Sequence, residues 1–372
     1  MKHLEHIQLY YKEIITSNPK EPIWNEGKLN PNWNYIDGCM LTALLFIYDV
    51  TKEKEIINYV IAFTDQYVLK DGTIKGYDPK NYSADDVSES RILFDLYEYT
   101  KDDKYLLAIK QTKTQLNSHP RTQTGIFWHN KNFLNQVWLD GLYMTHPFYA
   151  RYNRLYQELD KNNDIIHQFS EVRRFLKAKN NLYYHGYDES KVVFWSDKET
   201  GLSSNFWLRS IGWHVAALVD TASYFEKKSD DFNLLGVYLK ELIDAVLVYK
   251  DNKTNLFYQV VDKKDSVGNY LETSGSALIS YSILKGVRLG LLDNAYEKIG
   301  ISIFKGLLDY KIDFINHKLI VKDICLTASL GTTKSSNKDG SVESYVNEPI
   351  VENNPKGIAP LLMVYSEYLR LK

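Results

Sequence analysis

Helical periodicity runs through most of the 372-residue chain and limits its fold more than any other feature. Apolar residues recur three and four positions apart in twelve segments. Alternate segments differ in character: residues 38–50 and 210–219 are apolar on nearly every side, whereas residues 55–67 and 104–116 carry a charged face. A helix that is apolar all round is buried, and a helix with a polar stripe faces solvent. Six inner and six outer helices in alternation therefore predict an all-α fold, a closed (α/α)6 barrel.

The expected helices follow one another without a stretch rich in Pro, Gly or Ser, so we expect a single domain over residues 1–372. They cover residues 3–17, 34–49, 53–69, 85–99, 103–118, 137–152, 161–178, 205–226, 230–249, 272–288, 293–311 and 357–371. Between them, residues 182–187 and 192–195 predict a β-hairpin with its turn at 188–190, and residues 256–261 predict another strand. The polar residues 331–345 predict a long loop of the kind that often forms a lid or binds a ligand.

Composition narrows the class of partner. A net charge of -2 argues against a nucleic-acid partner, because such proteins carry a basic surplus. The 29 Tyr and 7 Trp residues suit stacking on sugar rings as well as core packing.

The two cysteines form no metal-ligand spacing and no phosphate-binding Gly loop occurs, so we expect neither a metal nor a cofactor. No apolar run is long enough for a membrane span, and the first residues precede no signal-like apolar region, so we expect a cytoplasmic protein with no membrane partner. Oligomeric state is not predicted.

Asp140 is the leading catalytic candidate, because this acidic residue lies inside an aromatic and apolar run, QVWLDGLYM. Such surroundings disfavour the charged carboxylate, so the pKa of Asp140 should rise towards the range in which a carboxylic acid delivers a proton near neutral pH. The alternative is that Asp140 caps a helix and has no further role.

Other polar residues stand at the starts of the expected inner helices. In a helical toroid these starts converge on one mouth, so residues far apart in the sequence meet there. Acids, an arginine and aromatic side chains at corresponding ends predict a polar cleft with stacking walls. The residues include Asn34, Tyr35, Asp37, Asp85, Asp86, Trp138, Asp140, Trp207, Arg209, Trp213, Glu272 and Lys356.

Five runs of sequence, in order and spacing, resemble glycoside hydrolase family 105, the unsaturated rhamnogalacturonyl and glucuronyl hydrolases. The runs are WNYIDGCML (33–41), WLDGLYM (138–144), WLRSIGW (207–213), GNYLETS (268–274) and NEPIVENNPKG (347–357). The resemblance extends from about residue 24 to the end of the chain, and it too implies a six-fold α/α barrel. It also implies the substrate class: an oligosaccharide with a 4,5-unsaturated uronic acid at its non-reducing end.

The resemblance also implies roles for individual residues. Asp140 would be the general acid and base, and Asp85 the second carboxylate. The sugar site would be lined by Tyr35, His129, Trp138, His185, Trp207, Arg209 and Trp213. Where the family often has Gly after the second carboxylate this chain has Asp86, so the choice between Asp85 and Asp86 stays open.

Each role has a structural alternative. Asp85 could cap a helix, Arg209 could belong to an ion pair, and Trp207 and Trp213 could be core residues. At the level of the whole protein, an α/α-barrel sugar 2-epimerase would use histidines as acid and base, so that loss of His185 would matter more than loss of Asp140. A non-catalytic helical scaffold is the remaining alternative, and it leaves the converging Asp, Arg and Trp residues unexplained.

Overall fold

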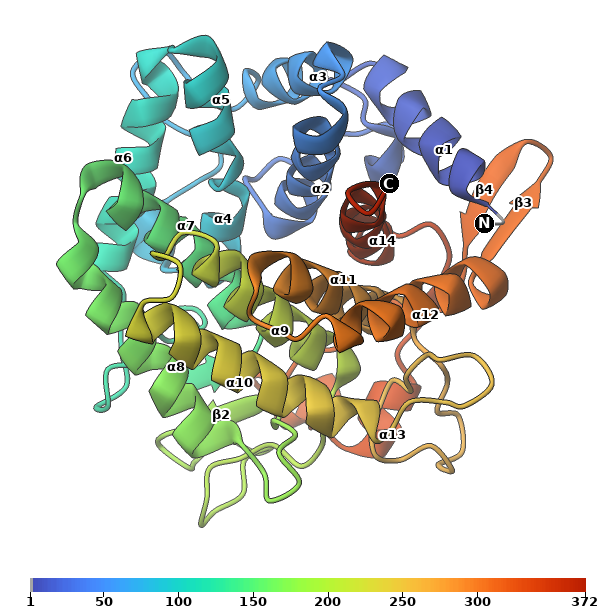
Figure 1. Ribbon diagram of the computed structural model, residues 1–372. Helices are drawn as coiled ribbons and strands as arrows, with labels where there is room; N and C mark the ends of the chain where they lie inside the picture. Colours follow the sequence, from blue (N-terminus) through green and yellow to red (C-terminus); the bar gives the residue numbers. More distant parts are fainter. Residues whose placement is uncertain (1–2) are drawn as a thin grey trace.

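A ring of inner helices forms the centre of the protein in a computed structural model that describes residues 3–372 (Figure 1). Each inner segment contacts the next, and the last, α14, packs against the first, α2, which closes the ring. Within the described residues the ring consists of α2 (Tyr35–Thr51), α4 (Ala84–Glu89) continued by α5 (Ile92–Thr100), α7 (Gly141–Tyr156), α9 (Leu208–Ala222), α11 (Thr273–Leu289) and α14 (Pro355–Leu369).

An outer layer of helices surrounds this ring (Figure 1). The outer helices bury one face only: α1, for example, buries Ile7, Tyr11 and Ile14. In contrast, every residue of α9 is buried. The outer helices are α1 (Leu4–Thr16), α3 (Lys54–Thr64), α6 (Asp103–Ser118), α8 (Asn162–Leu176), α10 (Asp230–Leu247) and α12 (Ala295–Tyr310).

The alternation of inner and outer helices expected from the sequence is therefore confirmed, and each of the twelve expected segments contains a helix. Two segments differ in detail. The expected helix over 85–99 is broken at Ser90 and Arg91 into α4 and α5. The expected helix over 137–152 begins only at Gly141, because residues 136–138 form a strand instead.

Polar side chains fix where several inner helices begin. The side chains of Asn34, Ser83, Glu272 and Asn354 accept backbone N–H groups in the first turns of α2, α4, α11 and α14. Gly38 allows α2 to approach α4 closely, since a Cβ atom there would lie 2.5 Å from the Cα of Glu89. These starts lie at one end of the ring, and the caps set their positions.

Short antiparallel strands join the loops. They are β1 (Gln136–Trp138) with β2 (Gly186–Asp188), β3 (Ile312–Ile315) with β4 (Lys318–Val321), and β5 (Ile324–Cys325) with β6 (Ile350–Val351). The expected hairpin between 182–187 and 192–195 is wrong, because β2 pairs with the distant β1. The buried carboxylate of Asp188 accepts the N–H groups of Val192 and Val193, which folds that segment into a turn and removes its donors from any ladder.

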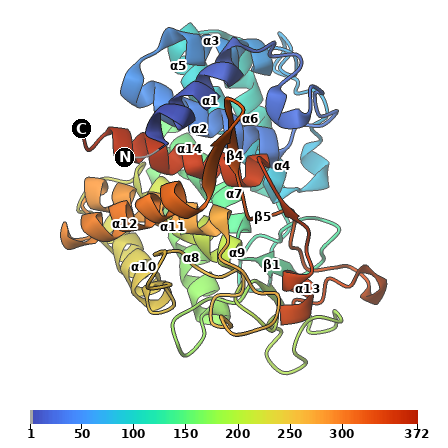
Figure 2. The ribbon, with the colours of Figure 1, turned by 90° about the vertical axis from the view of Figure 1, so that its right-hand side faces the viewer.

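Two further expectations need correction. Residues 256–261 form only isolated bridges, between Trp207 and Val260 and between Tyr258 and Leu271, rather than a strand. The expected loop over 331–345 contains a 3-10 turn (Lys334–Ser336) and most of a short helix, α13 (Val342–Val346). Figure 2 shows α13 projecting on the side of the ring where β1 and β5 lie, away from the C-terminus.

Candidate active site

Asp140 stands at the start of α7, but its carboxyl group does not cap the helix, so the capping alternative is wrong. The side chain is 16% exposed, and its Oδ1 atom is buried without a hydrogen-bond partner in the described structure. Burial raises the pKa of the Asp140 carboxyl, and the charge of Asp85 raises it further, against His129 and Arg209, which lower it. Asp140 therefore keeps its proton to a higher pH than an ordinary Asp.

Asp85 lies in the first turn of α4, close enough to Asp140 for its charge to raise the pKa of that carboxyl group. Ser83 caps that helix, so Asp85 is not needed as a cap. Its Oδ1 lies 3.9 Å from Nε2 of His129, and its side chain is 34% exposed. Burial raises the pKa of Asp85 to about 6, against the charge of Lys356.

Asp86 differs from Asp85 in its neighbours. Burial, together with the charge of Asp85, raises the pKa of Asp86 to about 7. The charge of Asp86 raises the pKa values of Tyr77 and Glu89. The charge of Asp85 instead raises the pKa values of Asp140 and Tyr35. These electrostatic interactions favour Asp85 over Asp86 as the second carboxylate of the mouth.

Arg209 provides a buried positive charge at the start of α9, where only 2% of the residue is exposed. It takes part in no ion pair within residues 3–372: one Nη donates to the carbonyl of Cys325, and Nε has no hydrogen-bond partner. Burial opposes its charge, but Cys325, Glu272 and Tyr35 together raise its pKa, so the guanidinium stays charged. The expected alternative of a structural ion pair is therefore wrong.

Tyr35, in the first turn of α2, lies within electrostatic reach of Arg209 and of both carboxyl groups. Burial raises the pKa of its hydroxyl, and the charges of Arg209, Asp85 and Asp140 all act on it. Residues from α2, α4, α7 and α9 therefore meet at one end of the ring, as the convergence of helix starts predicted.

His185 lies fully buried in the wall beside Asp140, with Nε2 4.0 Å from Oδ1 of Asp140. The backbone helps to set this distance, because the N–H of Leu139 donates to the carbonyl of His185 over 2.9 Å. Burial lowers the pKa of His185 to about 3, so the ring is neutral near pH 7. Its Nδ1 lies 2.8 Å from the hydroxyl of Tyr345 in α13.

Two tryptophans frame the histidines. The Trp138 ring stacks on His129 with centroids 4.4 Å apart, and the Trp207 ring lies 4.7 Å from His185. The Arg209 guanidinium lies over Trp207 at 5.1 Å. All three Trp side chains are buried, but Trp213 differs in its neighbours, since it packs in the core against Tyr143 with ring centroids 4.3 Å apart. That position favours packing over a sugar-binding role.

Two further residues reach the site: Lys356, which the sequence placed among the polar residues at the helix starts without an individual role, and Tyr345. Lys356, at the start of α14, donates to the carbonyl of Leu326 over 2.7 Å, and burial lowers its pKa to about 8. Its charge acts on Asp85. Tyr345 contacts His185 from a segment interpreted as a loop. Lys356 lies within a run that resembles family 105, so a signal for it was present, whereas only long-range folding brings Tyr345 to the site.

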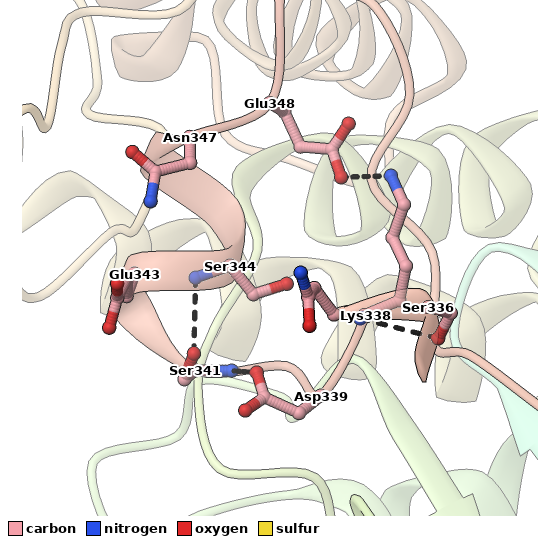
Figure 3. A pocket seen from close by; sticks show the side chains of 9 residues that line it. Ser336, Lys338, Asp339, Ser341, Glu343, Ser344, Asn347 and Glu348 are labelled. Atoms are coloured by element: carbon pink, nitrogen blue, oxygen red, sulfur yellow. Dashed lines mark hydrogen bonds and ion pairs between the residues drawn. The ribbon is translucent and has the colours of Figure 1, made fainter. Parts of the chain in front are cut away.

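A polar hollow of about 510 Å³ is lined by nine residues that lie between Ser336 and Glu348 in the sequence (Figure 3). Lys338 reaches across it to Glu348, and Asp339 accepts the N–H of Ser341. The charge of Glu348 acts to raise the pKa of Lys356, and the charge of Lys356 acts to lower the pKa of Asp85. The hollow is therefore coupled electrostatically to the carboxylates.

Comparison with known proteins identifies the family. A model of Glycosyl Hydrolase Family 88 matches residues 7–372. The chain belongs to glycosyl hydrolase family 88. It is 38% identical to a family 105 glycoside hydrolase of C. acetobutylicum ATCC 824, with a TM-score of 0.90 and 96% of this chain and 99% of that chain covered. Protein Atu3128 of Agrobacterium fabrum is 31% identical over 230 residues, which are 60% of this chain and 98% of that protein. The unsaturated glucuronyl hydrolase of Bacillus sp. GL1 has the same fold at 14% identity, with a TM-score of 0.64 and 94% and 89% covered.

Membership of family 88, with a family 105 structure so similar, confirms the resemblance found in the sequence. This family 88 chain is a glycoside hydrolase, which decides against the sugar 2-epimerase and the non-catalytic scaffold, and a glycoside hydrolase acts on an oligosaccharide substrate.

Two absences hold for residues 3–372, the part of the chain that the structure describes. No three His, Cys, Asp or Glu side chains there are grouped as metal ligands. Nor does that part of the chain contain a helix with the length and apolar character needed to cross a bilayer. Both cysteines, Cys39 and Cys325, are buried and free.

Proposed function

We propose that this enzyme removes a 4,5-unsaturated uronic acid from the non-reducing end of oligosaccharides produced by polysaccharide lyases. The observation that carries the proposal is the state of Asp140: a carboxyl group at the mouth, largely buried, capping nothing and with Oδ1 unpartnered. A buried polar atom without a partner is costly, so its retention supports a role in binding or chemistry. The family 105 structure supports the same reaction class.

The chemistry follows from the unsaturated ring, which contains a vinyl ether with an electron-rich C4. Protonated Asp140 donates its proton to C4 and leaves a cation at C5 that is shared with the ring oxygen. The resulting carboxylate then accepts a proton from water as that water attacks C5. The hemiketal opens, releases the next sugar and leaves a keto-uronate. Since the anomeric carbon is not attacked, the rule that relates carboxylate spacing to stereochemistry does not apply.

The other residues of the mouth have roles that their charges support. Arg209 binds the uronate carboxylate, because its planar guanidinium matches two oxygens and its Nε is free to donate. Asp85, 3.9 Å from His129, is the second carboxylate beside the reacting ring. Tyr35, His129, Trp138, His185 and Trp207 line the sugar site. The hollow of residues 336–348 receives the sugar that follows the uronate.

The test uses the absorbance of the substrate. The double bond of an unsaturated uronate is conjugated to its carboxylate, so hydration abolishes its ultraviolet absorbance. We expect this absorbance to fall when the enzyme meets one or more members of a panel of lyase-generated disaccharides. No change with any member, at enzyme concentrations approaching those of the substrate, would contradict the proposal.

A further inference from the structure

The contact between His185 and Tyr345 lies behind the candidate acid and has no role in the reaction as described so far. His185 has no exposed surface and sits between Trp138 and Trp207, with ring centroids 5.8 Å and 4.7 Å away. One ring nitrogen, Nδ1, lies 2.8 Å from the Tyr345 hydroxyl. The other, Nε2, has no hydrogen-bond partner and faces the equally unpartnered Oδ1 of Asp140 at 4.0 Å.

The direction of the Tyr345 hydrogen bond decides which nitrogen of His185 carries the proton. Burial raises the pKa of the Tyr345 hydroxyl and lowers that of His185 to about 3, so at neutral pH the phenol is protonated and the imidazole has one N–H. Within the described residues the Tyr345 hydroxyl bonds only to Nδ1. If Nδ1 were the donor, the buried phenol proton would have no acceptor, which is costly, whereas a proton on Nε2 faces the acceptor Oδ1 of Asp140 at 4.0 Å. Tyr345 therefore donates to Nδ1, and the proton of His185 is on Nε2.

This tautomer suits an acid that must give its proton to substrate. An unprotonated Nε2 would be a hydrogen-bond acceptor for the protonated carboxyl group of Asp140 and would draw its O–H away from C4. An Nε2–H group instead leaves that proton available, and it offers a donor to the carboxylate formed when the proton moves. The benefit appears as charge develops on Asp140, which is when stabilisation accelerates a reaction.

We propose that Tyr345 is a positioning residue that fixes the Nε2–H tautomer of His185 and so directs a donor towards Asp140. The inference rests on the proposed role of Asp140 as the acid. It also connects two parts of the site: Tyr345 belongs to α13, and the residues just before it line the hollow shown in Figure 3. The segment proposed to receive the leaving sugar thus reaches the catalytic carboxyl group through two side chains.

Tyr345 is held in place by more than its hydroxyl, so removal of that group is a clean test. Its ring is nearly parallel to that of Trp207, at 8° and 6.3 Å. Its carbonyl accepts the side chain of Gln259, which in turn accepts the indole N–H of Trp207. Tyr345→Phe should keep these contacts. Tyr11→Phe is the matched control, because Tyr11 is also buried and its hydroxyl donates to Glu53 on the outer layer, 3.0 Å away.

The test measures tautomer and turnover separately. In enzyme labelled with [15N]histidine, the protonated and unprotonated ring nitrogens resonate far apart, and His185→Gln assigns the signals. We expect the Nε2–H form in the wild type and in Tyr11→Phe. In Tyr345→Phe we expect a mixture of tautomers, with kcat on an unsaturated uronyl disaccharide lowered about 10-fold and KM changed less than about twofold.

Two results would overturn the inference: an Nδ1–H tautomer in the wild type, or a Tyr345→Phe enzyme in which both tautomer and kcat are unchanged. The wild-type spectrum requires no variant at Tyr345, so poor folding of Tyr345→Phe leaves that part of the test intact. The spectrum also requires no turnover. An inactive panel or an active Asp140→Asn enzyme would reject the proposed function, whereas a wrong tautomer would reject the role of Tyr345 alone.

Discussion

Two groups of buried charges lie inside the ring of inner helices, and they are treated in opposite ways. In the interior, both carboxylate oxygens of Asp220 are bonded: Arg91 donates over 2.6 Å, Lys285 over 2.7 Å and the Tyr281 hydroxyl over 2.6 Å. At the mouth, Oδ1 of Asp140 has no partner. Burial acts to raise the pKa of both acids, but Lys285 and Arg91 bring that of Asp220 below its ordinary value, whereas the pKa of Asp140 stays raised. The ion pairs of Asp220 join inner helices to one another. The polar atoms of Asp140 and Arg209 that have no partner are free to contact a substrate.

Asp140→Asn should have the largest effect on activity of the variants that test this difference between the mouth and the interior. The amide is nearly isosteric but cannot donate and recover a proton, so we expect turnover to fall by about 10² to 10⁴-fold. Folding should be unaffected, because the variant removes an unpartnered buried carboxyl group. Ultraviolet assays measure the turnover and thermal denaturation measures the stability. Activity within about threefold of the wild type would reject Asp140 as the acid.

Asp220→Asn should give the converse result. Loss of the charge leaves Arg91 and Lys285 buried without their counterion, and breaking such a pair typically costs about 3 to 5 kcal/mol. Denaturant unfolding should therefore show a large loss of stability, while the folded fraction keeps much of its activity. A variant as stable as the wild type would show that the ion pairs of Asp220 do not stabilise the packing of the inner helices.

Arg209→Lys sharpens the account of the mouth. Lysine keeps the charge but not the planar fork, so transition-state stabilisation should fall by about 2 to 4 kcal/mol if the pair with the uronate is desolvated. The comparison of kcat/KM between the two enzymes measures this loss. A substrate whose carboxylate has been reduced to an alcohol provides the control, since the wild type should lose its advantage on it. Equal wild-type activity on both substrates would show that Arg209 does not bind that carboxylate.

The pH dependence of stability should have opposite signs for Asp86, the neighbour of the mouth residue Asp85, and for Asp220 in the interior. The folded-state pKa of Asp86, about 7, lies above its ordinary value, so the folded protein binds more protons than the unfolded chain between about pH 4 and 7. Stability from this group is therefore lost as pH rises through that window, and Asp86→Asn should gain on the wild type as pH increases. Asp220 has a lowered pKa, so its contribution is present above the unfolded pKa and is lost as pH falls through the folded pKa. Unfolding free energies at several pH values, with both variants, measure the two slopes.

Shortening the segment beside the hollow should have the smallest effect on the chemistry. The N–H of Gly331 donates to the carbonyl of Lys338 over 2.7 Å, so the ends of this excursion already meet. Replacing residues 332–337 with a Gly-Ser turn should change the preference among leaving sugars and spare folding, because Tyr345 is retained. Rates on a panel of unsaturated disaccharides measure the preference, and unchanged rates on all of them would show that this segment is idle.

Much of the architecture could be predicted from local pattern. Helical periodicity located the inner and outer helices, and the starts of the inner helices gave Tyr35, Asp85, Asp140 and Arg209, which the structure brings together. These predictions succeeded because the spacing of apolar residues within a helix indicates which of its faces is buried.

Several of the errors involve partners that are distant in the sequence. The pairing of β1 with β2 joins residues about fifty positions apart, and the Asp188 turn replaced the expected hairpin. Trp213 has the same local signal as Trp207, yet only the fold decides which of the two lies near His185. That the whole chain is one domain, and the roles of the individual site residues, stay predictions.

Closure of the ring by α14 against α2 has a consequence for synthesis of the protein. The ribosome must add about 300 residues between the end of α2 and the start of α14, at about 5 to 20 residues per second. For about 15 to 60 seconds, the apolar flank of α2 that α14 will cover therefore has no permanent partner. A nascent chain in this state is a natural client for chaperones, and a stop codon shortly before Pro355 would make that exposure permanent.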